Sequence, residues 1–393
     1  MNPMKFATAA LATSAKTSTT MTIAAMTKKA VEHSILCSDG IRVAYQHFPI
    51  VDATTQKTTG YDNATKEEDP CPILCLHGWL DNAASFHLLA PYLSSQLRAA
   101  GFNDTGGSKG SEEDNKTQKE RIHGQGTPSH PGIFVIDLPG HGLSSHKSSD
   151  GPPQLLSEYA YYIAEVASAL SWNKFDIVGH SMGAGVAVVY AAAFPEHVRR
   201  MVLLEGGGPL AKNASDCSRH VRAACDRRIR SNKLLYPNGN DNKRESSARL
   251  YPNIGAAIAA RLNTVSRFPG SQYLSEQAAH AMVARATIPI PEKASTAQGN
   301  DVPVTFRHDP RLQWPSLQYF TREQVDSLYN DISCPICLLT AEDGWPFDRR
   351  SQDSVENILK PVQMKVLPGS HHFHADPDTA DAVASETLSF LRD

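Results

Sequence analysis

The sequence has no marked excess of charge and no long hydrophobic run. Its formal net charge is -3, without a long basic stretch, and this balance argues against a protein that binds nucleic acid. No window approaches the roughly 18 consecutive apolar residues that a membrane-spanning helix needs. We therefore expect a soluble protein without a stable membrane span.

Cysteine is also scarce, with seven residues in a chain of 393. Cys334 and Cys337 have the spacing of a redox or zinc pair, but they fall at the start of a predicted strand, and Cys71 with Cys75 is the only candidate partner pair. We interpret the cysteines as buried free thiols in a reducing compartment and expect no metal site.

The first thirty residues contain no acidic residue and no arginine, but they carry four lysines among many Ala, Ser and Thr. This composition is typical of a transit peptide for a mitochondrion or plastid, apart from the missing arginine. A tail before a later start at Met21 or Met26 fits equally well. We expect a cytoplasmic protein, and segment 1–30 leaves import into an organelle open.

What the chain does contain is a series of short, continuous apolar runs separated by helical patterns. Continuous runs are typical of parallel strands that are buried on both faces. The alternation predicts an α/β fold, with a mostly parallel sheet and helices on both faces. The predicted strands are 41–48, 72–76, 133–138, 175–178, 201–204, 335–340 and 364–367, and a final helix is predicted at 382–391.

Three stretches interrupt this alternation. Residues 52–69 and 103–130 are polar and have no apolar period, so we interpret them as surface loops. Residues 209–324 contain helical patterns, one of them basic, and predict a helical cap inserted between two parts of the core, 31–208 and 325–393.

Gly179-His180-Ser181-Met182-Gly183 lies where a predicted strand turns into a helix of small residues. The glycines fit a sharp turn in which any side chain at either position would collide with neighbouring backbone. Such a turn lifts Ser181 clear of the sheet at a helix N-terminus, whose dipole favours a developing negative charge. Tight packing of small residues is the alternative explanation, and the strand–turn–helix context favours a nucleophilic serine.

A nucleophilic serine needs a base, and a base needs an acid that holds its tautomer. Among sixteen histidines, His371 follows the last predicted strand and so lies at the sheet edge where Ser181 emerges. His372 is the alternative, and His374 is expected to pack against or cap the next segment. We predict Asp343 as the acid. The alternatives are Glu342 and, less favoured, Glu205 and Asp348.

The negative charge that develops on the substrate oxygen needs two backbone N–H donors. Met182 follows the nucleophile and supplies one amide. Trp79 follows His77-Gly78 at the end of an early strand and is predicted to supply the other. A simple strand-ending turn is the alternative interpretation of His77-Gly78.

Four segments resemble the α/β-hydrolase superfamily: "LHGWLDNAASFHLLAPYL", "VIDLPGHGLSSH", "LSWNKFDIVGHSMGAGVA" and "LPGSHHFH". The first three, together with "HDPRLQWPSLQYFTREQV", are most similar to its serine hydrolase-like branch. The resemblance implies that Ser181 is the nucleophile, that His371 is the base, and that the amides of Trp79 and Met182 bind the oxyanion. One departure concerns the acid, because the superfamily usually places it slightly later than Asp343, where this chain has Gly344.

These residues predict a hydrolase of carboxylic esters or related small acyl substrates that forms an acyl-enzyme and needs no metal or organic cofactor. A serine at the elbow, where halide- and epoxide-cleaving relatives use Asp, argues against an alkyl-enzyme. An acyltransferase or a carbon–carbon bond hydrolase would use the same residues. The displaced acid leaves a further alternative open, a ligand-binding protein without turnover. Neither the physiological substrate nor the oligomeric state follows from the sequence.

Overall fold

The computed structural model describes residues 30–50, 71–99, 131–148, 151, 154–235, 249–270, 272–290 and 302–392. The predicted loops 52–69 and 103–130 lie outside these residues, as does the predicted N-terminal segment except for its last residue. Within the described residues, no helix is both long and apolar enough to cross a bilayer.

The main sheet contains eight strands in the order β1-β2-β4-β3-β5-β6-β12-β13. β1 and β2 pair antiparallel, β2 also runs antiparallel to β4, and the remaining neighbours are parallel. The predicted mostly parallel α/β sheet is therefore confirmed. Its strands are β1 (Val31–Leu36), β2 (Arg42–Pro49), β3 (Ile73–Leu76), β4 (Gly132–Ile136), β5 (Phe175–His180), β6 (Val198–Leu204), β12 (Ile336–Asp343) and β13 (Gln363–Ser370).

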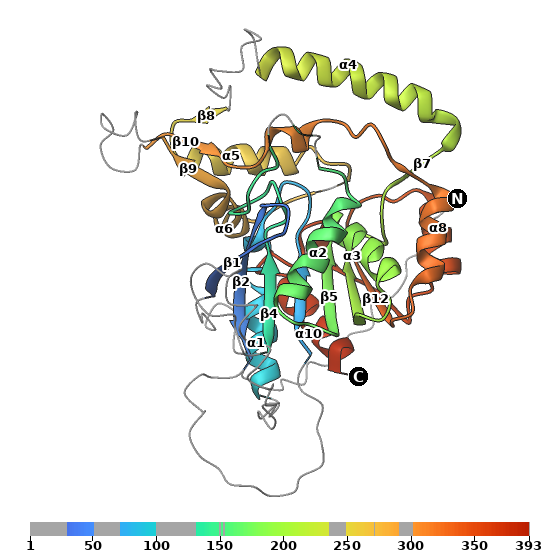
Figure 1. Cartoon of the computed structure of the whole chain (residues 1–393). Helices are drawn as coiled ribbons and strands as arrows, with labels where there is room; N and C mark the ends of the chain where they lie inside the picture. The colour runs from blue at the N-terminus through green and yellow to red at the C-terminus, as the bar shows by residue number, and fades with distance from the viewer. Residues whose placement is uncertain are drawn as a thin grey trace, which may run out of the picture.

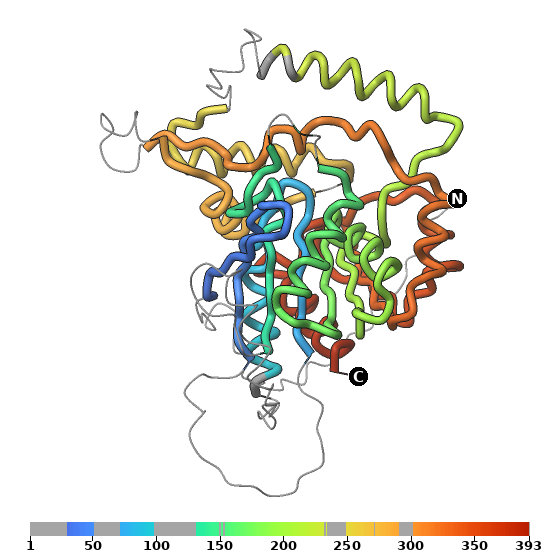
Figure 2. The backbone as a smooth tube through the Cα atoms, in the orientation of Figure 1, coloured from blue at the N-terminus to red at the C-terminus, as the bar shows by residue number. Residues whose placement is uncertain are grey.

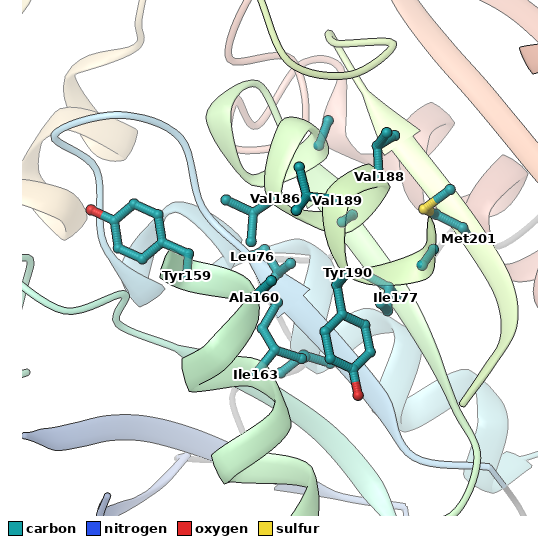
Figure 3. Close-up of a cluster of buried hydrophobic side chains, with 14 of the residues drawn as sticks. Leu76, Tyr159, Ala160, Ile163, Ile177, Val186, Val188, Val189, Tyr190 and Met201 are labelled. Carbon is teal, nitrogen blue, oxygen red and sulfur yellow. The ribbon is translucent and has the colours of Figure 1, made fainter. Parts of the chain in front are cut away.

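The central strands consist of continuous apolar residues because both faces of the sheet are covered. Within β3, Leu74 and Leu76 enter one buried cluster, whereas Ile73 and Cys75 enter the other. Figure 3 shows part of the first cluster, where Leu76 of the sheet packs with side chains of two helices.

Helices cover the two faces of the sheet, as Figure 1 shows. The first cluster contains residues of α2 (Glu158–Ala169), α3 (Met182–Ala193) and α8 (Arg322–Asp331), and the second contains residues of α1 (Leu89–Ala99) and α10 (Ala380–Arg392). The short helix α9 (Arg349–Ser354) follows β12. This arrangement leaves the carboxyl ends of the parallel strands free to carry a site.

The chain between β6 and α8 forms an insertion at the place of the predicted cap 209–324, whose last residues already belong to α8. It leaves and rejoins the core at two short parallel strands, β7 (Ala211–Lys212) and β11 (Phe320–Thr321). Figure 2 shows its yellow and orange segments along one end of the sheet. Its other elements are α4 (Cys217–Leu235), β8 (Leu250–Tyr251), α5 (Ile254–Val265), α6 (Glu276–Ala286), β9 (Thr287–Pro289) and β10 (Val304–Phe306).

All seven cysteines are free thiols. Cys334 and Cys337 are at least half-buried, and burial raises the pKa of each to about 12. The prediction of buried thiols is wrong for Cys217 and Cys225, which are exposed on α4. This helix is the exception because most of its side chains face away from the core.

Candidate active site

Ser181 lies at the sharp turn between β5 and α3. A Cβ at Gly179 would lie 2.6 Å from the carbonyl oxygen of Gly183, and one at Gly183 would lie 2.2 Å from that of Leu76. Close backbone approach therefore explains both glycines of the motif. Ser181 itself has φ 52° and ψ -112°, a conformation that a residue with a side chain seldom adopts and that surrounding structure must hold in place.

His371 begins the loop after β13 and faces Ser181. Its Nε2 lies 2.9 Å from Ser181 Oγ. Main-chain contacts fix the residue, because its amide donates to Gln272 Oε1 at 2.8 Å and its carbonyl lies 2.8 Å from His180 Nε2. His180, which belongs to the Gly-His-Ser-Met-Gly motif, thus also supports the backbone of His371.

The carboxylate beside His371 belongs to Glu205. Its Oε2 lies 2.9 Å from His371 Nδ1 and accepts the amide of Trp345 at 2.8 Å, while Oε1 accepts the amide of Ala341 at 2.7 Å. Since a carboxylate only accepts, His371 Nδ1 donates and Nε2 is left to accept from the Ser181 hydroxyl. Glu205 directly follows β6 with φ 53°, so a second residue in a strained conformation stands at the site.

The structure does not bring the predicted acid, Asp343, to the histidine. Asp343 and Glu342 are exposed at the end of β12, and Asp348 instead caps α9 by accepting from Ser351. The space beside the histidine is already filled, because a Cβ at Gly344 would lie 2.3 Å from Glu205 Oε1. Of the acids that the sequence offers, Glu205 is the one whose carboxylate contacts His371, and the sequence marks it only as an acid directly after a neighbouring strand.

Trp79 and Met182 both line the same cavity as Ser181. Within the described residues, no carbonyl or side chain accepts a hydrogen bond from either backbone amide. The Trp79 indole donates to the carbonyl of Leu312 at 2.9 Å, which ties this loop to the insertion. That the two amides bind an oxyanion stays a prediction, and both amides remain available to do so.

A buried polar cluster lies beside these groups. Arg261 of α5 forms an ion pair with Asp81 of the loop that carries Trp79, and His372 Nε2 lies 3.3 Å from the second oxygen of Asp81. Burial would raise the pKa of Asp81, but Arg261 and His372 hold it well below its usual value. Within the described residues, His372 therefore contacts Asp81 and makes no hydrogen bond with Ser181.

His180 and His374 are also fully buried in this cluster, with their ring centroids 4.1 Å apart. Burial lowers the pKa of both imidazoles well below the usual value, and the neighbouring histidines lower it further. His374 packs against Phe86 and His180, so the predicted contact with the segment that follows it stays a prediction. Within the described residues, no group of three or more His, Cys, Asp or Glu side chains is arranged to hold a metal ion.

Ser181 and His371 open onto a cavity of about 680 Å³, which falls in the size range of small-molecule sites. Both the core and the insertion line it. Its apolar side chains include Leu156, Met182, Leu312, Trp314, Phe320 and Trp345. The cavity therefore suits a ligand with a substantial apolar part.

Comparisons with known proteins agree with this fold. Residues 72–376 match the model of the alpha/beta hydrolase fold family. A serine hydrolase-like protein of Dictyostelium discoideum is 29% identical over 343 residues, which cover 85% of this chain and 79% of the relative. Serine hydrolase-like protein 2 of Homo sapiens is 27% identical over 336 residues, covering 82% and 87%. A hypothetical protein of Pseudomonas aeruginosa with a crystal structure superposes with a TM-score of 0.65 at 26% identity, covering 93% of this chain and 100% of the other.

Proposed function

This chain belongs to the alpha/beta hydrolase fold family, and on that premise we propose that it cleaves carboxylic esters or related acyl compounds through Ser181, His371 and Glu205. The similarity to serine hydrolase-like proteins supports a hydrolase in general. The observation that carries the finer proposal is the chain of two 2.9 Å contacts, from Ser181 Oγ to His371 Nε2 and from His371 Nδ1 to Glu205.

In the first half-reaction, Ser181 Oγ attacks the carbonyl carbon of the substrate while its proton passes to His371 Nε2. Glu205 stabilises the imidazolium, and the amides of Trp79 and Met182 hold the oxyanion. The tetrahedral intermediate then collapses, His371 protonates the departing oxygen, and the acyl group stays on Ser181.

In the second half-reaction, His371 takes a proton from water, and the resulting hydroxide attacks the acyl-enzyme. The oxyanion forms again at the same amides, and its collapse returns the proton to Ser181 and releases the carboxylic acid. No cofactor takes part. The apolar wall of the cavity is available for the acyl chain or the alcohol.

A binding protein without turnover was the alternative that rested on the absent acid at position 344. Glu205 provides a carboxylate beside His371 from the neighbouring strand, and this contact supports turnover over binding alone. The backbone strain at both Ser181 and Glu205 also supports a functional site, since such conformations concentrate where geometry serves chemistry.

The test is labelling with a fluorophosphonate probe, which reacts with an activated serine. Wild-type protein should be labelled, and Ser181→Ala should not. Ser157→Ala is the matched control, because Ser157 lines the same cavity and its side chain makes no capping hydrogen bond to α2. Absence of labelling in the wild type, or loss of labelling in the control alone, contradicts the proposal. Steady-state release from a p-nitrophenyl ester then separates turnover from a single acylation.

A further inference from the structure

The arginines that line the cavity differ in how they are neutralised. Arg261 and Arg311 each form an ion pair with an aspartate. The other two, Arg227 and Arg228, are neighbours on α4. Among the described residues, no carboxylate forms an ion pair with either of them. The cavity wall formed by α4 is therefore positive, and no carboxylate of the described residues pairs with it.

Arg228 is held in place and yet keeps donors free. Its Nε donates to the carbonyl of Pro315 at 3.1 Å, and its guanidinium lies 5.6 Å from the centre of the Trp314 ring. Its terminal nitrogens make no hydrogen bond within the described part of the chain. Burial lowers the pKa of Arg228, as expected for a desolvated cation without an adjacent carboxylate.

A fixed guanidinium with free terminal nitrogens matches the planar oxygens of a carboxylate or a phosphate. Figure 1 shows α4 at the outer end of the molecule, on the side opposite α10. The apolar residues near Ser181 and the two arginines of α4 line one continuous cavity. A ligand that fills this cavity thus meets an apolar environment in one part and an uncompensated positive charge in another.

We propose that Arg227 and Arg228 bind an anionic oxygen group of the substrate, so that the enzyme prefers acyl esters which carry a carboxylate or phosphate at a distance from the scissile bond. This inference rests on the proposed esterase function. It assigns the two arginines to substrate selection, whereas the chemical step uses the groups around Ser181.

Two matched pairs of esters test the preference. In the first pair, p-nitrophenyl hexanoate is compared with the p-nitrophenyl monoester of adipic acid, which places the charge on the acyl side. In the second pair, phenyl hexanoate is compared with its 4-carboxyphenyl analogue, which places the charge on the leaving group. The quantity measured is kcat/KM for the anionic ester divided by kcat/KM for the neutral ester. The two esters differ in intrinsic reactivity, but this difference is the same for every enzyme variant and cancels when the ratio is compared between variants.

We expect the ratio to fall by about tenfold or more in an Arg227→Gln/Arg228→Gln double variant for at least one pair, the effect of losing a charge-assisted hydrogen bond. Arg230→Gln is the matched control, since Arg230 lies on the same helix, is exposed and does not line the cavity. It should keep the wild-type ratio. A ratio that is equal in the wild type and the double variant for both pairs overturns the inference.

A binding measurement on a variant that cannot turn over substrate tests this inference independently of the proposed function. Isothermal titration of the Ser181→Ala variant with the adipic monoester and with inorganic phosphate shows which oxygen group binds. Binding that disappears when the two arginine substitutions are added supports the inference even if the wild type hydrolyses no ester. Absence of binding by both probes overturns it, whether or not the esterase assay succeeds.

Discussion

Replacing Glu205 by Gln preserves the shape of the side chain and removes its charge, so it isolates the acid of the proposed triad. The carboxylate accepts three hydrogen bonds, from the amides of Ala341 and Trp345 and from His371. Glutamine has one acceptor oxygen and a donor amide group. In either orientation, therefore, at least one of the three N–H groups faces another donor.

The two orientations harm the site in different ways. If the amide group replaces Oε2, it donates to His371 Nδ1, so the ring proton moves to Nε2, which no longer accepts from Ser181. If it replaces Oε1, the ring keeps its tautomer, but the imidazolium loses its counter-charge. Amide substitution of a triad acid lowers kcat by about 10⁴-fold, and we expect a loss of at least about 10³-fold, or roughly 4 kcal/mol in the barrier.

The assay is steady-state hydrolysis of a p-nitrophenyl ester, with the rate of fluorophosphonate labelling as a second readout. Asp343→Asn and Glu342→Gln are matched controls that change exposed carboxylates. Each should stay within about twofold of the wild type, as surface substitutions away from a site usually do. A kcat for Glu205→Gln above about a tenth of wild type, or a collapse in either control, would refute the assignment of Glu205.

Two further predictions concern groups around the triad. Arg261→Met leaves the buried carboxylate of Asp81 without its cation, and urea unfolding at neutral pH should show a loss of about 3 kcal/mol, against little change for exposed Arg230→Met. In the wild type, the lowered pKa of Asp81 stabilises the fold at any pH above the pKa that this carboxyl has in the unfolded chain. That stabilisation is lost as the pH falls through the pKa of Asp81 in the folded protein. In the variant, burial raises the pKa, so the deficit should shrink as pH is lowered toward about 4; a small, pH-independent deficit would contradict the reasoning. Gly344→Ala places a methyl group 2.3 Å from Glu205 Oε1, and a displacement of about 1 Å should lower kcat by up to about 10²-fold, whereas Gly255→Ala on α5 should be neutral.

The sequence predicted the central sheet well because its strands are buried on both faces. Continuous apolar runs survive in β3, β4 and β5 for that physical reason. The edge strand β1 was not predicted, since it is exposed at both ends and carries Glu32 and His33 among its apolar residues. β1 forms because it pairs with β2, and this pairing cannot be predicted from the residues of β1 alone.

The histidine and the acid show where single-sequence reasoning reaches its limit. His371 and His372 are adjacent, and only the contacts of Ser181, Glu205 and Asp81 determine which ring faces the serine. The acid is ambiguous because β6 and β12 are parallel neighbours that end at one edge of the sheet. A carboxylate from either strand end can reach the same histidine, so order along the chain does not select between Glu205 and the acids after β12.

The insertion contributes to the frame of the site as well as to its cavity. Arg261 contacts Asp81, Leu312 accepts from Trp79, and Gln272 accepts the amide of His371. Gln272 Nε2 also lies 3.0 Å from the carbonyls of Asp343 and Gly344, so it links the histidine loop to the end of β12. The loops that carry the proposed oxyanion donor and the base are therefore both positioned by residues of the segment that lines the substrate cavity. Substitution of Arg261 or Gln272 should therefore alter kcat as well as KM, because the contacts of these two residues hold the loops that carry the reacting groups in place.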